Sequence, residues 1–336
     1  SAGDTPLAHL AAFRVGMTYY QREEYLQALA AFKGILTKHP NSELAADTRD
    51  ILAKTLLIET KKLFAQASYP ELVQLGTENK NLIDQNFWPE IRHYLAAAFA
   101  AMDLFAEAAE LWEANKDFTE RQDERLFGLG QAYSTIGRYE QAAQTLDEFR
   151  SKFPGHQQAA QALVLQARAE AALDKAPLAL SHLEKALAAQ PGLAGNPEVQ
   201  DLLGKLYLKT GDFAKGAAAL ETALAAIKKG KAAAEDIFLI YSLLGQAYTR
   251  LGQKDKAVQS LEAALKNLPQ SPYPETLYLI AGAYKKLDLA DRSKSALDLL
   301  LKSEDQFWRS VAAEEIKALL LNKEVTRLLG GGPPGK

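Results

Sequence analysis

The residues of this chain that could do chemistry are few and widely spaced. The five histidines are His9, His39, His93, His156 and His182. No two of them stand three or four residues apart, so no pair shares a helix face in the way that two zinc-ligating histidines do. The chain contains no Cys, which excludes thiolate ligands, a thiol nucleophile and disulfide bonds. We therefore predict no metal site and no cofactor.

The glycines do not form a nucleotide-binding loop either. No Gly-x-x-x-x-Gly-Lys-Ser/Thr sequence is present, so the usual phosphate-binding loop is absent. Gly128-Leu129-Gly130 matches half of a dinucleotide-binding fingerprint, but it lies inside a helical pattern with no strand before it, where such a site requires a strand and a turn. No nucleophile, base and acid stand out as a set. We predict that the chain has no catalytic residues and is not an enzyme.

Composition narrows the class of protein further. Of 336 residues, 48% are hydrophobic and 24% are charged, with a formal net charge of -3. This apolar content excludes a disordered chain, and the balanced charge disfavours a nucleic-acid partner. No run of about 18 apolar residues is present to form a transmembrane segment. The chain starts at Ser1, so we expect any signal peptide or membrane anchor to lie outside it.

An internal repeat organises the sequence. One clear copy reads LGQAYSTIGRYEQAAQTLDEFRSKFP around Gly130, and a second reads LGQAYTRLGQKDKAVQSLEAALKNLP around Gly245. In each copy the distance from that Gly to the closing Pro, Pro154 or Pro269, is 24 residues. Apolar residues recur at helical spacing on both sides of a central Gly, which predicts two amphipathic helices joined by a turn.

About eight such copies follow one another with a base period of 34 residues and small insertions. The predicted units are residues 9–42, 43–80, 89–121, 122–155, 160–192, 197–230, 238–270 and 274–303. Residues 304–329 are predicted to form a terminal capping helix, and the Gly- and Pro-rich residues 330–336 a flexible tail. One helix pair cannot bury its own apolar stripe, but stacked pairs can.

These copies resemble the signature of the tetratricopeptide-repeat (TPR) family, a Gly, Tyr, Ala, Phe and Pro pattern over 34 residues. The likeness covers about residues 8–303, although the signature Trp of the first helix is absent and the copy at 43–80 departs at most signature positions. The resemblance implies an all-α fold, a right-handed superhelical solenoid of about eight helix hairpins with a C-terminal capping helix. It also implies a single domain over residues 1–329.

A narrower likeness lies near the start of the chain. His39-Pro40-Asn41-Ser42 is followed by Ala45-Ala46-Asp47. This run resembles the repeats of bacterial cell-envelope TPR proteins, such as the outer-membrane assembly lipoproteins and the Tol-Pal-associated division coordinators. The resemblance implies a periplasmic or envelope-associated protein, and the absence of Cys favours the same location. A cytoplasmic location is the alternative.

By resemblance to the family, partners bind on the concave face, which is lined by the first helix of each unit. In the N-terminal half the matching positions are Phe13, Met17, Tyr20, His93, Phe127, Gln131 and Ser134. In the C-terminal half they are Arg168, Asp201, Lys205, Leu208, Lys209, Ser242, Gln246, Thr249, Arg250, Tyr278 and Lys285. The later group is basic and suits an acidic segment or a C-terminal carboxylate. The earlier group is more aromatic and suits a hydrophobic segment.

The function that follows is a non-catalytic scaffold that binds a peptide or a protein subunit in this groove, within a bacterial envelope assembly. One alternative is the TPR portion of a larger protein with an effector domain beyond residue 330. An alternative of a different class is an enzyme domain acting on peptides or glycans. Self-association through the exposed end units is a further alternative.

Overall fold

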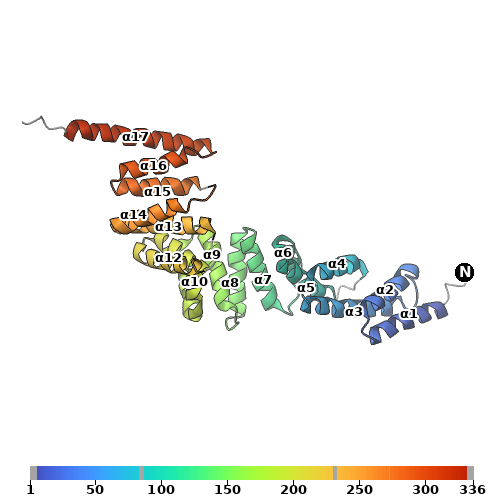
Figure 1. Ribbon diagram of the computed structural model, residues 1–336. Helices are drawn as coiled ribbons and strands as arrows, with labels where there is room; N and C mark the ends of the chain where they lie inside the picture. The colour runs from blue at the N-terminus through green and yellow to red at the C-terminus, as the bar shows by residue number, and fades with distance from the viewer. Residues whose placement is uncertain (1–5, 83–86, 230–232, 272, 331–336) are drawn as a thin grey trace, which may run out of the picture. The chain divides into compact units, whose positions relative to one another are not determined.

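The structure, a computed structural model, describes residues 6–82, 87–229, 233–271 and 273–330. In these residues every regular element is a helix: seventeen α-helices and two short 3₁₀ helices, with no strand (Figure 1). The predicted all-α class is confirmed.

The chain divides into two compact units, residues 1–173 (unit 1) and residues 174–336 (unit 2). The helices of unit 1 are α1 (Pro6–Gln21), α2 (Tyr25–Lys38), α3 (Ala45–Ala65), α4 (Tyr69–Asn79), η1 (Lys80–Leu82), α5 (Trp88–Ala101), α6 (Phe105–Glu113), α7 (Gln122–Thr135), α8 (Tyr139–Lys152) and α9 (Ala159–Ala172). The helices of unit 2 are α10 (Ala176–Ala189), η2 (Pro191–Gly195), α11 (Pro197–Thr210), α12 (Phe213–Ile227), α13 (Ala234–Arg250), α14 (Lys254–Lys266), α15 (Pro274–Lys286), α16 (Ala290–Leu300) and α17 (Gln306–Gly330). The predicted continuity of one solenoid over residues 1–329 stays a prediction.

Consecutive helices pair as hairpins within each unit. In unit 1 the pairs are α1 with α2, α3 with α4, α5 with α6 and α7 with α8. In unit 2 they are α11 with α12, α13 with α14 and α15 with α16. The predicted copy at 160–192 corresponds to α9 and α10, which fall in different units. Even the weak copy at 43–80 forms two helices, because its apolar spacing is kept where its signature residues are lost.

A residue with left-handed backbone follows the first helix of every copy. The eight residues have φ between 55° and 90°: Glu23, Ala67, Asp103, Gly137, Asp174, Gly211, Gly252 and Asp288. Three of them are glycines, and Gly137 and Gly252 are the central glycines of the two clear copies. After Gly211, the N–H of Asp212 donates a hydrogen bond to the carbonyl of Tyr207 at 2.9 Å, which closes the helix end. The five other positions hold side chains at a cost of about 1–2 kcal/mol each.

Small signature residues allow the two helices of a hairpin to approach closely. A Cβ added at Gly245 on α13 would lie 2.4 Å from Leu261 Cδ2 on α14. The same contact recurs in the preceding hairpin, where a Cβ at Gly204 would lie 2.4 Å from Leu220 Cγ. Both leucines are fully buried. The Gly and Leu signature positions therefore fix the distance between paired helices.

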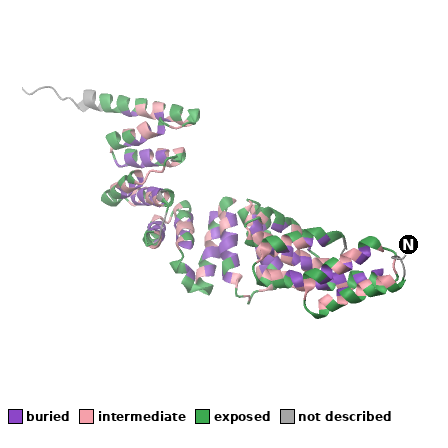
Figure 2. Cartoon of the chain, turned by 45° about the vertical axis from the view of Figure 1, so that its right-hand side comes forward, coloured by how far each residue is buried: buried purple, intermediate pink, exposed green. Residues whose placement is uncertain are grey.

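Buried residues lie mainly on the helix faces that point toward other helices, and exposed residues point outward (Figure 2). In unit 2 one continuous core includes Leu220, Leu244, Leu261, Tyr284 and Leu297, contributed by five successive helices. Each hairpin therefore completes the core of its neighbour, as the repeat pattern predicts.

The predicted capping segment is α17. Its Ala312 and Leu319 are buried in the core of unit 2, and Trp308 and Ile316 pack against that core. Phe307, near the start of the same helix, is 64% exposed. Of the predicted tail, Gly330 ends α17, and residues 331–336 lie outside the described residues.

Candidate functional site

Unit 2 carries a depression where the predicted groove residues of its last hairpins come together. It has a volume of about 320 Å³ and lies between α13 and α15, with α16 and α17 contributing to its wall. The lining residues are Gln246, Thr249, Arg250, Tyr278, Leu279, Ala281, Gly282, Ala283, Lys285, Lys286, Ser293, Leu297 and Glu315. Five of them, Gln246, Thr249, Arg250, Tyr278 and Lys285, are residues that the sequence placed in the groove.

The basic side of the depression consists of Arg250, Lys285 and Lys286. The Arg250 guanidinium lies 5.7 Å from the ring centre of Phe213, and Lys285 Nζ lies 2.8 Å from a Glu315 carboxylate oxygen. Arg250 and Lys286 have no ion-pair partner among residues 6–82, 87–229, 233–271 and 273–330. Two cations at this site are thus available to an anionic group.

The other side of the depression is aromatic and apolar. Tyr278 packs against Trp308 of α17 with ring centres 5.7 Å apart, and Leu279 is 47% exposed. No heavy atom lies within 4 Å of the position that a Cβ at Gly282 would take. The floor of the depression is therefore open at Gly282, beside an apolar side chain that a ligand can contact.

The structure places the other predicted basic residues differently. Lys205 Nζ pairs with Asp201 at 2.6 Å on the same helix, and Lys209 pairs with Asp174. Arg168 lies half-buried on α9, in unit 1. These cations do not join the depression, and carboxylates already neutralise the two lysines.

The aromatic and apolar groove residues predicted in unit 1 pack against other side chains of the same unit. Phe13, Met17 and Tyr20 on α1 are half-buried and pack against the core of the first hairpins. Phe127 is 9% exposed and packs on Phe149 with ring centres 5.6 Å apart. Gln131 remains exposed on α7. The aromatic residues of this part of the predicted groove therefore take part in the packing of unit 1.

His93, also predicted for the groove, is buried between α5 and α7. Its Nε2 lies 3.1 Å from a Glu124 carboxylate oxygen, and its Nδ1 has no hydrogen-bond partner. Burial lowers the pKa of His93, although the hydrogen bond to Glu124 acts in the opposite direction. His93 is therefore neutral at neutral pH and serves to join two helices.

The signature tyrosines carry a set of contacts that the sequence reasoning missed. Tyr133 donates a hydrogen bond to Glu113 at 2.8 Å, and Tyr207 donates one to Glu184 at 2.9 Å. Burial, followed by these hydrogen bonds, raises the pKa of each tyrosine to about 12. Tyr248 and Glu221 form the same pair.

The sequence contains a pattern that could have indicated these Tyr–Glu hydrogen bonds. Each acceptor Glu directly follows the large signature residue of the preceding hairpin's second helix, as in Trp112-Glu113, Leu183-Glu184 and Leu220-Glu221. A hydroxyl that reaches a carboxylate of the preceding hairpin ties successive copies together.

The described acidic and histidine side chains were compared with the geometry of a metal site. In the described part of the chain, no three His, Asp or Glu side chains are arranged to hold a metal ion. His9 and His39 stack with ring centres 4.0 Å apart, and His9 Nδ1 lies 3.1 Å from the Ser42 hydroxyl.

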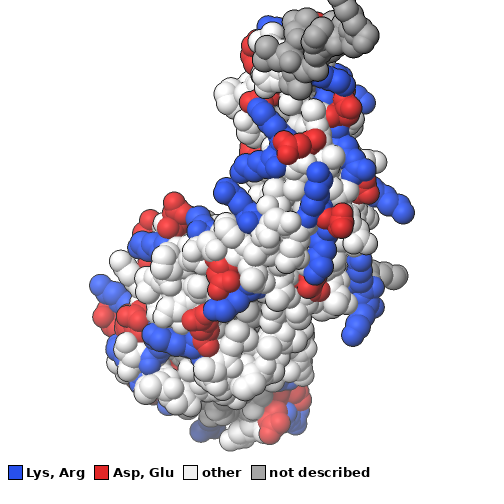
Figure 3. All heavy atoms as spheres, turned by 90° about the vertical axis from the view of Figure 1, so that its left-hand side faces the viewer, with Lys and Arg blue, Asp and Glu red and all other residues white. Residues whose placement is uncertain are grey.

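On the face seen in Figure 3, Lys and Arg are interspersed with Asp and Glu. None of the described helices is both long enough and apolar enough to cross a bilayer.

The sequence was compared with models of protein families and with curated proteins to find which family the repeat belongs to. Family models described as tetratricopeptide repeats match residues 10–42, 127–194 and 202–272, together about half of the chain. The chain belongs to the tetratricopeptide-repeat family. A search of curated proteins found no match.

Among solved structures, the crystal structure of the APC/C hetero-tetramer Cut9-Hcn1 is similar, with a TM-score of 0.52 and 15% identity over 91% of this chain. The similarity covers 54% of that chain, so this TPR chain spans about half of its length. The C-terminal part of a TPR repeat-containing protein from Cytophaga hutchinsonii has a TM-score of 0.52 and 15% identity, covering 76% of this chain and 98% of that one. MamA from Desulfovibrio magneticus RS-1 has a TM-score of 0.43 and 20% identity, covering 53% and 92%. At these identities the similarity concerns the fold.

Proposed function

We propose that this TPR chain is a non-catalytic scaffold that binds a peptide or a segment of a protein subunit in the depression between α13 and α15. The observation that carries the proposal is the convergence of Gln246, Arg250, Tyr278 and Lys285 on one depression. TPR folds are typical of protein-interaction scaffolds. Such a protein acts by mass action, holding its partner where other subunits can reach it.

The chemistry of the depression favours an acidic ligand with an apolar side chain. Arg250 presents a planar guanidinium that can donate two hydrogen bonds to one carboxylate. Lys286 adds a second positive charge at the same site. An apolar residue of the ligand would contact Leu279 above the open floor at Gly282. The ligand class is therefore a short segment that combines an acidic residue, or a free C-terminal carboxylate, with an aliphatic or aromatic neighbour.

Fluorescence anisotropy with labelled peptides tests this function. We expect acidic peptides with a free C-terminus to bind more tightly than their amidated or neutral counterparts, and to lose affinity as salt increases. Combined Arg250→Glu and Lys286→Glu substitutions should abolish the preference. The matched control is the same charge reversal at Lys254 and Lys266, which are exposed on α14 outside the depression. Unchanged binding after reversal in the depression would exclude it as the site.

For location, we propose the bacterial cell envelope, on the periplasmic side. The run from His39 to Asp47 and the absence of Cys support this setting. Sequencing the complete gene would reveal whether a signal peptide or lipidated Cys precedes Ser1 and whether an effector domain follows residue 330. Fractionation of cells that express the full protein would separate the envelope from the cytoplasm. Recovery in the cytoplasmic fraction alone would contradict the proposal.

A further inference from the structure

The last helix of unit 2 is covered on one side only. α17 packs on α15 and α16 through Trp308, Ala312, Ile316 and Leu319. Among the described helices of unit 2, none packs on its opposite side (Figure 1). This arrangement differs from α13 and α15, each of which contacts the second helix of its own hairpin and also the next hairpin.

The uncovered part of α17 is apolar. Phe307 is 64% exposed, Leu320 is 52%, Leu321 is 65% and Val325 is 43%. No other helix has as many exposed large apolar side chains within the ranges that the structure describes. Groups of exposed apolar residues of this kind mark surfaces that associate with another protein.

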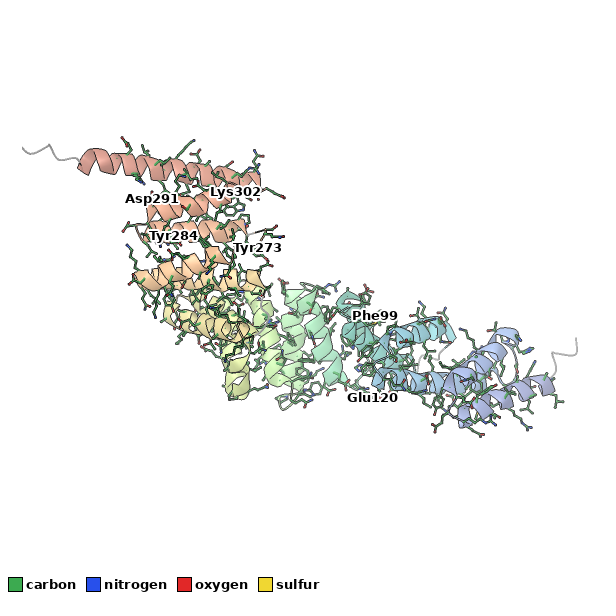
Figure 4. The ribbon with its side chains drawn as sticks, in the orientation of Figure 1. Phe99, Glu120, Tyr273, Tyr284, Asp291 and Lys302 are labelled. Carbon is green, nitrogen blue, oxygen red and sulfur yellow. The ribbon has the colours of Figure 1, made fainter. Side chains whose placement is uncertain are left out.

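The end of α17 also extends past the hairpin that supports it. Lys323 Nζ pairs at 3.0 Å with Asp291, the second residue of α16. Figure 4 shows Asp291, near the start of α16, and Lys302, just past the end of α16, at opposite ends of the last hairpin. From Lys323 the helix continues to Gly330, beyond the start of α16.

The charges on α17 favour one kind of occupant, a second copy of the same helix. Glu314 and Lys317 are each 73% exposed, lie between Phe307 and Leu321 in the sequence, and pair with each other on the same helix at 2.8 Å. In an antiparallel pair centred between residues 315 and 316, Glu314 of one copy lies opposite Lys317 of the other, and the reverse pair forms at the same time. Phe307 then lies beside Leu321 and Val325 of the second copy. Opposed helix dipoles favour the same orientation.

We propose that two copies of this chain associate through antiparallel packing of their α17 helices about a two-fold axis. The interface is isologous, because each copy contributes the same apolar and charged residues. The α17 helix of the second copy then packs on α17 as α14 packs on α13 and as α16 packs on α15. The surface is separate from the depression that contains Arg250.

Sedimentation velocity of the full chain over about 1 to 100 µM tests the proposal. We expect a dimer, and we expect Leu321→Glu to raise its dissociation constant at least about 100-fold, or about 2.7 kcal/mol. Leu321 is exposed and Glu is a good helix former, so the helical content should not change. The matched control is Leu178→Glu on α10, where the leucine is 47% exposed and the dimer should persist. A monomer at every concentration, or a dimer that tolerates Leu321→Glu, overturns the proposal.

A charge exchange tests the orientation of the two helices. Glu314→Lys alone and Lys317→Glu alone each place like charges opposite one another and should weaken the dimer. An equimolar mixture of the two variants restores both opposite-charge pairs in a mixed dimer. The double variant restores them in a dimer of identical chains. Failure of both combinations to recover the dimer rules out the antiparallel pairing.

Discussion

Two glycines of unit 2 should respond in opposite directions to the same substitution. At Gly245, an added methyl group would lie 2.4 Å from Leu261 Cδ2 and 2.6 Å from its Cγ, whereas carbon atoms prefer about 3.5–4.0 Å. Leu261 is fully buried and cannot swing into solvent. At Gly282, the same methyl group would meet no heavy atom within 4 Å.

The expected magnitudes follow from these contacts. Overpacking a core of this kind costs about 1–3 kcal/mol, and the better helix propensity of Ala offsets about 1 kcal/mol of that. We therefore expect Gly245→Ala to lower the free energy of unfolding by up to about 2 kcal/mol. Gly282→Ala should raise it by about 0.5–1 kcal/mol, because only the helix propensity changes.

Urea unfolding followed by far-UV circular dichroism provides the measurement, with the midpoint and slope compared between variants. The double variant Gly245→Ala plus Leu261→Ala tests the cause, because removing the leucine side chain removes the clash. The double variant should lose less free energy of unfolding than Gly245→Ala and Leu261→Ala lose when their separate losses are added. If Gly245→Ala and Gly282→Ala both stabilise the protein, the close approach of α13 and α14 does not exist as described.

Three further outcomes are expected. Tyr133→Phe should cost about 1 kcal/mol at neutral pH. Because the pKa of Tyr133 is about 12 when folded and 10.0 when unfolded, its stabilising contribution should fade as pH rises between these values, and urea titrations at several alkaline pH values should show a smaller decline for the variant. Gly211→Ala, at a φ of 90°, should lower the thermal midpoint, equivalent to a loss of about 1–2 kcal/mol. Since burial lowers the pKa of His93, its contribution is present above the unfolded pKa and is lost as pH falls, so His93→Gln should reduce the acid sensitivity of unfolding.

Much of the fold could be predicted because each copy of the repeat carries the same pattern of helix, turn and packing residues. The spacing from Gly130 to Pro154 contains a helix, a turn and a second helix, and the structure has α7, Gly137 and α8 in those places. The weak copy at 43–80 was located because Tyr69-Pro70-Glu71-Leu72 stands where the clear copy has Tyr139-Glu140-Gln141-Ala142, and the structure has α3 and α4 there. The turns that lack Gly were harder to place, because Asp and Glu at a left-handed position look like ordinary surface residues in the sequence.

The candidate site was only partly predictable. The positions of Arg250, Tyr278 and Lys285 within the repeat predicted that they face the groove. In the structure all three line one depression. The four-residue spacing of Asp201 and Lys205 could have indicated their ion pair on one helix. The sequence could not indicate that Asp174 would pair with Lys209, because that pairing depends on rotamers and on distances between helices. It also could not separate positions that face a groove from positions buried between two helices, as happens at His93.

The order of contacts in unit 2 has a consequence for how the protein is made. The helices that share extensive contacts lie no more than two elements apart along the chain. Contacts between segments that are close in sequence cost little loop-closure entropy and form quickly. The preceding copy is already complete when a newly synthesised hairpin leaves the ribosome. We therefore expect each copy to dock on the previous one while the next is still being translated.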